Sequence, residues 1–452
     1  MSAGSLWAMN EDLRSAIDDL FPSLQTTLED LVRIPSISAP GFDAAEVRRS
    51  AGAVSALLAD AGFESVRLLE VEGAHPAVFA EIPAPAGAPT VLLYAHHDVQ
   101  PVGDPADWDR DPFEPVEEDG RLLGRGSSDD KAGIVLHLGA VMAHGGRPPV
   151  GVKVIVEGEE EVGSTHLGEF LDQYRELLAA DVIVIADSGN WRVGQPALTT
   201  SLRGLVDCTV EVRTLKHAIH SGQFGGVIPD ALTVLSRLLA TLHDRDGNVA
   251  IPGLVYGESD ELDLTEDELR SQADTVDGLE LIGSGSLTSR MWTQPAVAVL
   301  AIDAPSVGNA VNALVPVARA KVSLRIAPGD RPARALSALV AHLEQNVAWG
   351  AEVVVTTGAT GDAFALETTG PANDAFRTAF EEAWGRETVN MGVGGSIPFV
   401  AAFSEAYPAA TILLTGVADP TSRAHGPNES VDLDDVRKGA LAEAIALRLL
   451  AP

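Results

Sequence analysis

Short apolar strands alternate with helical stretches in the first half of the chain. Runs rich in β-branched and aliphatic residues occur at 90–94, 152–156 and 182–186, and apolar residues recur at helical spacing at 134–144 and 167–178. This alternation predicts a largely parallel α/β sheet with helices on both faces. In such a sheet ligands bind beyond the carboxyl ends of the strands, so the residues that follow each strand are the first candidates for a site.

The pattern changes near residue 203. An alternating strand is expected at 205–213, a helix at 228–243, and then a strand, a helix and a strand at 317–326, 332–348 and 351–357. A helix at 371–384, a strand at 411–414 and a helix at 434–449 return to the first pattern. We therefore expect a catalytic domain formed by residues 1–202 and 367–452, with a smaller α+β domain of residues 203–366 inserted in it. Residues 244–293, rich in Asp, Glu and Gly, have no assignment.

Charge and cysteine content limit the classes of partner. The 452 residues carry 31 Lys+Arg against 65 Asp+Glu, a formal net charge of −34. Nucleic acids and anionic membranes are bound mainly through clustered Lys and Arg, so neither is expected as a partner. No apolar run reaches the roughly 18–20 residues that span a bilayer. Cys208 is the single cysteine, and the first residues lack the pattern of a secretion signal, so we expect a cytoplasmic protein.

Acidic residues and histidines follow each predicted strand of the larger domain. Because the carboxyl ends of parallel strands meet at one edge of a sheet, these side chains should converge. Histidine and carboxylate ligands together favour zinc, cobalt or manganese. The second imidazole nitrogen of a metal-bound histidine usually donates to a carboxylate, which is the arrangement that His96 and Asp98 offer. The candidates are His96, Asp98, Asp129, Glu157, Glu159, Glu160, Glu161, Asp187 and His425.

Charge arithmetic favours two metal ions over one. Asp129, Glu161 and Asp187 supply −3 and two divalent ions supply +4, while histidines bind as neutral imidazoles. The remaining positive charge is what a bridging hydroxide would neutralise. Two metals ~3.5–4 Å apart can lower the pKa of a water toward about 7 and hold the other oxygen of the reaction centre. A neighbouring carboxylate that is not a ligand can then act as the general base.

Five motifs together resemble the family of dinuclear zinc hydrolases that includes carnosinase, cytosolic nonspecific dipeptidase, acetylornithine deacetylase, succinyl-diaminopimelate desuccinylase and glutamate carboxypeptidase. The motifs are AHHDVQP at 95–101, GRGSSDDK at 124–131, EGEEEVGS at 157–164, HSG at 220–222 and GGSIP at 394–398. The resemblance spans roughly residues 11–450. It implies a zinc-exopeptidase-like α/β catalytic domain with a mostly parallel mixed sheet, and an inserted two-layer α+β domain that acts as lid and dimerisation domain.

The resemblance also implies the role of each metal-site residue. Asp129 would bridge two zinc ions. His96 and Asp187 would complete one site, and Glu161 and His425 the other. Glu160 matches the general base, and Asp98 matches the residue that orients His96. The peptide bond between Asp129 and Asp130 is typically cis in this family.

Further residues are assigned by the same resemblance to substrate binding. In relatives the residue that matches His220 reaches into the partner subunit's active site, which implies a homodimer through the inserted domain. Arg325 and Asn309, or Asn312, match positions that contact substrate. Gly395 and Ser396 open a helix expected at 397–403, whose free N–H groups could hold a substrate carboxylate. Charged residues that dipeptidases often have before this motif are here Gly392 and Val393.

The implied reaction is hydrolysis of the peptide bond of dipeptides by a dizinc-bridged hydroxide, with Glu160 as general base. Asp187 favours this branch, because deacylases and carboxypeptidases of the family tend to have glutamate there. An N-acyl amino acid amidohydrolase or a carboxypeptidase is the alternative, with manganese or cobalt as alternative metals. A non-catalytic protein that binds metal or peptide on this fold is a more remote one.

Overall fold

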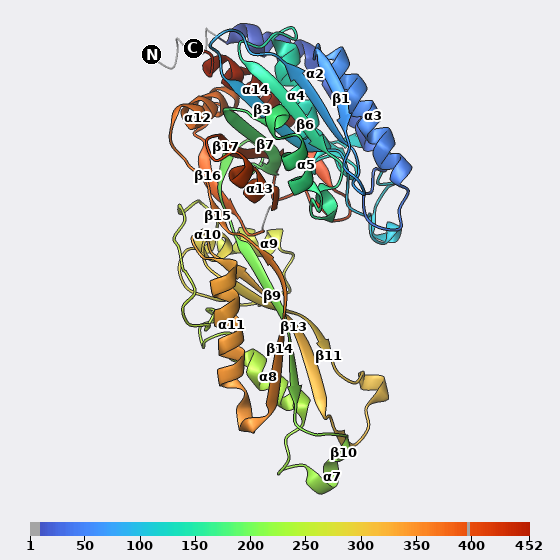
Figure 1. Ribbon diagram of the computed structural model, residues 1–452, viewed down its shortest axis with the longest axis vertical. Helices are drawn as coiled ribbons and strands as arrows, with labels where there is room; N and C mark the ends of the chain where they lie inside the picture. Colours follow the sequence, from blue (N-terminus) through green and yellow to red (C-terminus); the bar gives the residue numbers. More distant parts are fainter. Residues whose placement is uncertain (1–9, 396–397) are drawn as a thin grey trace. The chain divides into compact units, whose positions relative to one another are not determined.

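The chain forms two compact units. Figure 1 colours the ribbon by position in the sequence, so the segments of each unit can be followed there. The computed structural model describes residues 10–395 and 398–452. The first unit comprises the described parts of Met1–Thr200, Leu366–Asn390 and Pro398–Pro452, and the second comprises Ser201–Ala365 with the described part of Met391–Ile397. The second unit therefore also includes Gly394 and Gly395, which the expected boundaries of 203–366 leave out.

A mixed sheet forms the centre of the first unit. Its strand order is β1-β2-β6-β3-β7-β17-β8-β15, with β16 paired to β8. The central strands β6, β3, β7 and β17 run parallel, so the predicted parallel centre is confirmed. Strand β2 pairs antiparallel with β6, β8 pairs antiparallel with β17, and β1 pairs antiparallel with β2. The strands that lie wholly in the first unit are β1 (Ser65–Leu69), β2 (Ala77–Ile82), β3 (Thr90–His96), β6 (Gly151–Glu157), β7 (Val182–Gly189) and β17 (Thr411–Ala418). The strands β8 (Ala197–Leu202) and β16 (Val389–Val393) include residues counted in the second unit, and β15 (Phe364–Ala365) belongs to that unit.

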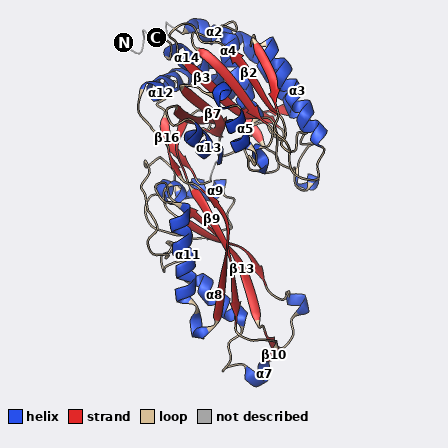
Figure 2. Cartoon of the chain, in the orientation of Figure 1, coloured by secondary structure: helices blue, strands red, loops and turns tan. Residues whose placement is uncertain are grey.

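Helices cover both faces of this sheet, as Figure 2 shows. Leu93 and Ala95 of β3 join the apolar core that includes α4. Tyr94 lies between them and points the opposite way, because side chains alternate along a strand, and it stacks on Phe399 of α13. The helices are α2 (Glu11–Val32), α3 (Ala44–Asp60), α4 (Lys131–Ala143), α5 (Leu167–Gln173), α6 (Arg175–Leu178), α12 (Pro371–Trp384), α13 (Pro398–Ala406) and α14 (Leu433–Leu449), with 3-10 turns η1 (Pro105–Asp107) and η2 (Glu160–Val162).

A second, three-stranded sheet joins distant parts of the first unit. It has the order β18-β5-β4, formed by β18 (Ser430–Asp432), β5 (Arg121–Leu123) and β4 (Val116–Glu118). Ser430 pairs with Leu123 in antiparallel register. The residues just before β18 therefore lie beside those just after β5, which are the GRGSSDDK segment.

The second unit has two layers. Its antiparallel sheet has the order β11-β13-β9-β14, and α8 and α11 pack on that sheet. Cys208 is buried in β9 between the sheet and these helices. The elements are β9 (Gly204–Arg213), β10 (Ile219–His220), α7 (Ser221–Phe224), α8 (Ala231–Ala240), α9 (Glu266–Gln272), α10 (Leu287–Trp292), β11 (Ala296–Asp303), η3 (Val307–Asn309), β12 (Ala313–Leu314), β13 (Val317–Ile326), α11 (Pro332–Asn346), η4 (Ala348–Gly350) and β14 (Glu352–Gly361).

Strand β11 is the main element of this unit that the sequence does not predict. Its apolar residues follow one another without alternation, so they show no buried and exposed face. The strand lies at the edge of the sheet, and its last six residues are exposed. Among the described residues, no helix is both long and apolar enough to cross a membrane.

Candidate metal centre

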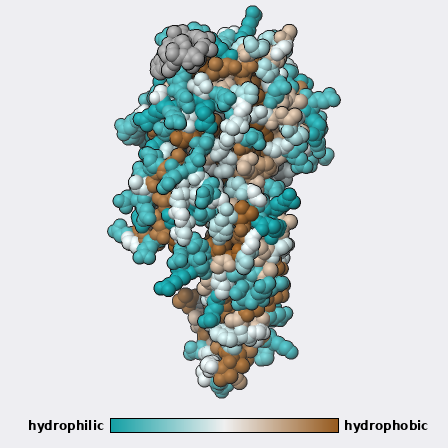
Figure 3. All heavy atoms as spheres, turned by 90° about the vertical axis from the view of Figure 1, so that its left-hand side faces the viewer, coloured by the Kyte–Doolittle hydropathy of each residue, from teal (hydrophilic) through white to brown (hydrophobic). Residues whose placement is uncertain are grey.

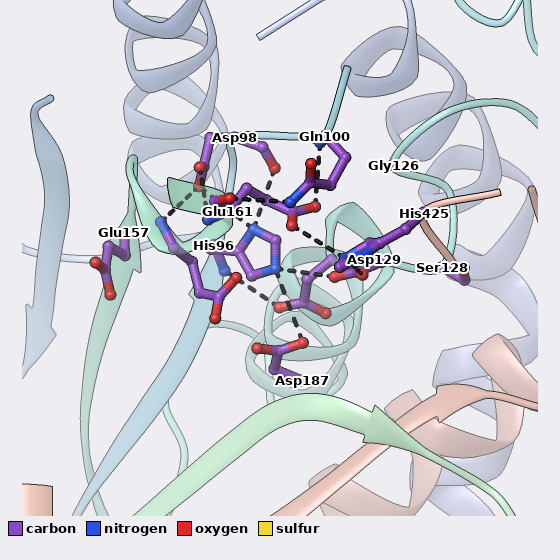
Figure 4. A network of polar contacts seen from close by, with 12 residues as sticks. His96, Asp98, Gln100, Gly126, Ser128, Asp129, Glu157, Glu161, Asp187 and His425 are labelled. Carbon is purple, nitrogen blue, oxygen red and sulfur yellow. Dashed lines mark hydrogen bonds and ion pairs between the residues drawn. The ribbon is translucent and has the colours of Figure 1, made fainter. Parts of the chain in front are cut away.

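Five predicted ligands from five separate segments meet at the carboxyl edge of the main sheet (Figure 4). His96 is the last residue of β3, and Asp187 lies near the end of the neighbouring strand β7. Asp129 precedes α4, Glu161 lies in the turn after β6, and His425 lies in the loop after β17. Their ligand atoms form two groups within 4.8 Å, His96 with Asp129 and Asp187, and Asp129 with Glu161 and His425.

Asp129 belongs to both groups because its two oxygens face different histidines. Oδ1 lies 3.0 Å from Nε2 of His96, and Oδ2 lies 3.0 Å from Nε2 of His425. Oε2 of Glu161 lies 3.0 Å from the same nitrogen of His425. Oδ1 of Asp187 lies 3.8 Å from Nε2 of His96. The geometry is that of a carboxylate shared between two ligand sets.

The electrostatics of this donor set fit divalent cations. Burial and the negative charge of Asp187 raise the pKa of Glu160 to about 9, and burial raises the pKa of Asp187. Hydrogen bonds to Asp129 and Glu161 raise the pKa of His425 to about 10. Buried carboxyl groups that lie close together have raised pKa values, because burial and mutual repulsion disfavour their charged form. A positive charge between them removes this effect. Imidazole nitrogens and carboxylate oxygens are together the donors that zinc, manganese and cobalt accept.

Comparison with known proteins assigns the chain to a family. Residues 92–448 match the model of peptidase family M20/M25/M40. This chain is a member of peptidase family M20. It is therefore a hydrolase of a metallopeptidase family, and the resemblance expected from its motifs is confirmed.

Dipeptidases are among the proteins most similar to this M20 peptidase. It is 36% identical over 400 residues to the cysteinylglycine-S-conjugate dipeptidase of Corynebacterium striatum, covering 86% of this chain and 87% of that protein. It is 28% identical to the Cys-Gly metallodipeptidase of Schizosaccharomyces pombe, covering 77% of each. The crystal structure of human carnosine dipeptidase 1 superimposes with a TM-score of 0.78 at 25% identity, covering 98% of this chain and 99% of that one.

In this M20 peptidase Asp98 does more than the sequence suggests. Nδ1 of His96 lies 3.1 Å from the main-chain oxygen of Asp98 and 3.4 Å from its Oδ1, so the carbonyl is the nearer acceptor. The carboxylate accepts hydrogen bonds from the hydroxyl of Ser38 at 2.6 Å and from the N–H groups of Glu160 and Glu161 at 3.2 and 3.0 Å. Asp98 thus contacts His96 chiefly through its main-chain oxygen, and its carboxylate holds the backbone of the two glutamates.

Sequence reasoning missed several residues around the ligands of the M20 peptidase. Asp130 accepts a hydrogen bond from the N–H of His96 at 3.1 Å, and the Asp129–Asp130 peptide bond is cis, as the resemblance implies. Gln100 donates through its N–H to Oε1 of Glu161 at 3.1 Å. Glu429 accepts a hydrogen bond from the N–H of Asp129. Only proximity to a motif in the sequence could have indicated these residues, because hydrogen bonds between distant segments leave no periodic signal.

The remaining predicted site residues that the structure describes lie in the second unit. His220 is exposed at the end of β10, Arg325 is half-buried on β13, Asn309 is exposed at the end of η3, and Gly395 is half-buried after β16. A Cβ atom added at Gly395 would meet only Val393, at 3.9 Å, so space is open beside it. Ser396 lies outside the described residues. The roles of these residues remain predictions.

Proposed function

We propose that this M20 peptidase hydrolyses the peptide bond of dipeptides with two divalent metal ions, most simply zinc. The observation that carries the proposal is the sharing of Asp129 between two groups that each contain one histidine. Similarity to a dipeptidase over 86% of the chain supports the substrate class. When bound, the two cations would supply an acidified water and an electrophile for the substrate carbonyl.

Glu160 is proposed as the general base. Its backbone N–H is held by Asp98, and its side chain makes no hydrogen bond with the residues that the structure describes. Its pKa is raised to about 9, first by burial and then by Asp187. A bound cation would lower that pKa again, toward the range in which a carboxylate can take a proton from water and pass it to the leaving amine.

His220 and Arg325 are proposed to bind the substrate. Nδ1 of His220 accepts a hydrogen bond from the N–H of Gly222 at 3.0 Å, so the proton of the neutral ring is on Nε2. That N–H is a donor suited to the oxyanion of a tetrahedral intermediate. The guanidinium of Arg325 makes no hydrogen bond within the described chain, which leaves its donors free for a substrate carboxylate. Asn309 and Gly395 are proposed as further contacts, as is Ser396.

A substrate panel tests the proposal. The zinc-loaded protein would be assayed with Cys-Gly, an S-alkylated Cys-Gly and β-Ala-His, alongside N-acetyl, N-succinyl and N-carbamoyl amino acids. We expect cleavage of the dipeptides and bound zinc near two ions per chain. Hydrolysis of the acyl substrates alone would replace the proposal with an amidohydrolase. An inactive protein holding two ions would replace it with a binding function.

A homodimer through the second unit is proposed because β11 offers a pairing surface. This edge strand exposes Val299, Leu300 and Ile302, and Leu300 is 62% exposed. Exposed edge strands with apolar side chains are templates for a second chain. Apolar side chains also gather where α7 and β10 lie, at the lower end of the view in Figure 3. Light scattering should give a dimer that Leu300→Glu dissociates. The control Val276→Glu, at an exposed apolar residue outside β11, should leave the dimer intact.

A cytoplasmic location also remains a proposal. Its support is the single cysteine of the chain, Cys208, which is buried in β9 and free. Reduced thiols are the rule in that compartment.

A further inference from the structure

Glu429 brings a buried carboxylate to the loop that carries Asp129. It lies in the first unit, four residues after His425 and directly before β18. Its side chain is fully buried. It is not itself within the two ligand groups. A buried carboxylate outside the ligand set therefore needs another role.

Among the described residues, every hydrogen bond of this carboxylate is with the GRGSSDDK segment. Oε2 accepts from Nη1 of Arg125 at 2.6 Å and from the N–H of Gly126 at 3.0 Å. Oε1 accepts from the N–H and the hydroxyl of Ser128, both at 3.0 Å, and from the N–H of Asp129 at 3.1 Å. The main-chain oxygen of Glu429 accepts from the N–H of Gly124 at 2.9 Å. One residue thus binds most of the backbone that leads into Asp129.

All of these partners are donors, which suits a carboxylate at this position. A carboxylate offers only acceptor positions, whereas a glutamine amide would turn one of its two ends into a donor facing other donors. The charge is balanced by Arg125, which is 1% exposed, so the pair adds no net charge beside the metal ligands. In Figure 4, Gly126 and Ser128 lie on the same side of Asp129 as His425.

The same residue belongs to the segment that carries His425. That loop has left-handed backbone at Arg423, His425 and Asn428, and it is closed by the N–H of Ser430 donating to the oxygen of Ser422 at 2.9 Å. Since Asp129 and His425 face each other at 3.0 Å, their separation depends on how these two loops are joined. The carboxylate of Glu429 joins them just outside the ligands.

We propose that Glu429 is a positioning residue, which holds the Asp129 loop and the His425 loop at the spacing that a metal ion between Asp129, Glu161 and His425 requires. The inference rests on the proposed two-metal function. His96 ends β3 and Asp187 lies near the end of the neighbouring parallel strand β7, so the positions of these two ligands depend on the main sheet instead. Loss of Glu429 should therefore weaken one of two metal-binding steps far more than the other.

The test is a zinc titration of Glu429→Gln in competition with a chromogenic chelator. Replacing a residue that orients metal ligands typically lowers the metal affinity by about 10–100-fold. We expect a loss of this size for one of the two zinc-binding steps and less than about a threefold change for the other. The matched control is Glu443→Gln. Glu443 is also buried and pairs with His137 at 2.9 Å, but it contacts none of the five ligands. It should leave both steps unchanged.

The outcomes separate the inference from the function on which it rests. Should the unsubstituted protein bind no zinc, the proposed function fails. Should it bind two ions and Glu429→Gln bind both equally well, or lose no more than Glu443→Gln, only the inference is overturned. If Glu429→Gln does not fold, Ser128→Ala removes one hydroxyl donor at 3.0 Å without touching the charged pair, and it should weaken the same step by a few-fold. An unchanged Ser128→Ala would then overturn the inference.

Discussion

Each carboxylate oxygen of Asp129 lies 3.0 Å from a different histidine, so this one residue connects the two halves of the cluster. Burial raises the pKa of Asp129, but hydrogen bonds from His425 and His96 outweigh it and lower the pKa below its usual value. Asp129 is therefore ionised at any working pH and offers both oxygens as ligands. Glu160 and Glu161 are adjacent in sequence, but only Glu161 contacts a histidine.

Exchanging the two glutamates for glutamine should separate their roles. Glu160→Gln should lower kcat by about 10²–10⁴-fold, the usual contribution of a general base, and keep the metal content of the unsubstituted protein. Glu161→Gln should lose bound metal, because it removes a charged ligand next to His425. Initial rates and elemental analysis of the same preparations measure both effects. Metal loss in Glu160→Gln would show that the two roles are reversed.

Metal binding should release protons. In the protein without metal, the pKa of His425 is raised to about 10 by its hydrogen bonds to Asp129 and Glu161, so its ring is protonated at pH 7. A metal binds only the neutral imidazole. Affinity should therefore rise with pH and level off only as the pH passes about 10. Calorimetric titration with zinc at pH 7 in two buffers of different ionisation enthalpy should give different apparent binding enthalpies, because the buffer takes up the released protons. Equal heats would contradict the prediction.

At the scale of elements, the site depends on how closely α4 packs. This helix begins just after Asp130 and is buried along most of its length between the sheet, α2 and α14. A Cβ atom at Gly139 would lie 2.9 Å from Cβ of Ala440 in α14 and 3.0 Å from Cδ1 of Leu24 in α2. The facing Gly439 of α14 would meet Leu136 of α4 at 2.8 Å. Glycine on both helices allows their backbones to approach.

Filling this contact should destabilise the first unit. Gly139→Val should lower the free energy of unfolding by about 1–3 kcal/mol, the usual cost of overpacking a core. Gly52→Ala is the control: Gly52 is exposed in α3, with nothing within 4 Å of an added Cβ atom. There, the higher helix propensity of alanine should raise the free energy of unfolding by about 0.5–1 kcal/mol. Urea titrations of the metal-free proteins measure both. If Gly139→Val and Gly52→Ala changed the free energy of unfolding equally, α4 and α14 would not approach each other closely at Gly139.

At the scale of the whole molecule, the predicted site residues divide between the two units. All five ligands and Glu160 are in the first unit, whereas His220, Arg325, Asn309 and Gly395 are in the second. Each unit has an apolar core of its own. A residue of one subunit can then serve the other if the second unit forms the proposed dimer.

Mixing two inactive variants tests this shared site. Glu160→Gln and His220→Ala homodimers should each be nearly inactive, since removing an oxyanion donor alone costs about 10²–10³-fold. In a mixed dimer, the His220→Ala subunit keeps Glu160 and receives the intact histidine from its partner, so activity should return on mixing. Adding Leu300→Glu to both variants should prevent the recovery. If activity stays absent when mass measurement shows mixed dimers, His220 acts within its own subunit.

The sequence by itself determined the alternation of apolar strands and helices, and with it the edge at which His96, Asp187, Glu161 and His425 would gather. That much follows from local chemistry, because strand and helix periods are written in neighbouring residues. The convergence of these residues followed from the rule that parallel strands place their carboxyl ends together. The motif GRGSSDDK marked Asp129 as a candidate before any geometry was known.

Only the tertiary structure decided what holds these residues in place. The contacts of Glu429 with Asp129, and of Asp98 with the backbone of Glu160, join segments that lie 300 and 62 residues apart in the chain. The exposed edge strand β11 likewise depends on which strand pairs with β13. Such contacts arise from strand register and loop closure, which depend on the packing of the whole unit and leave no repeating pattern in the sequence.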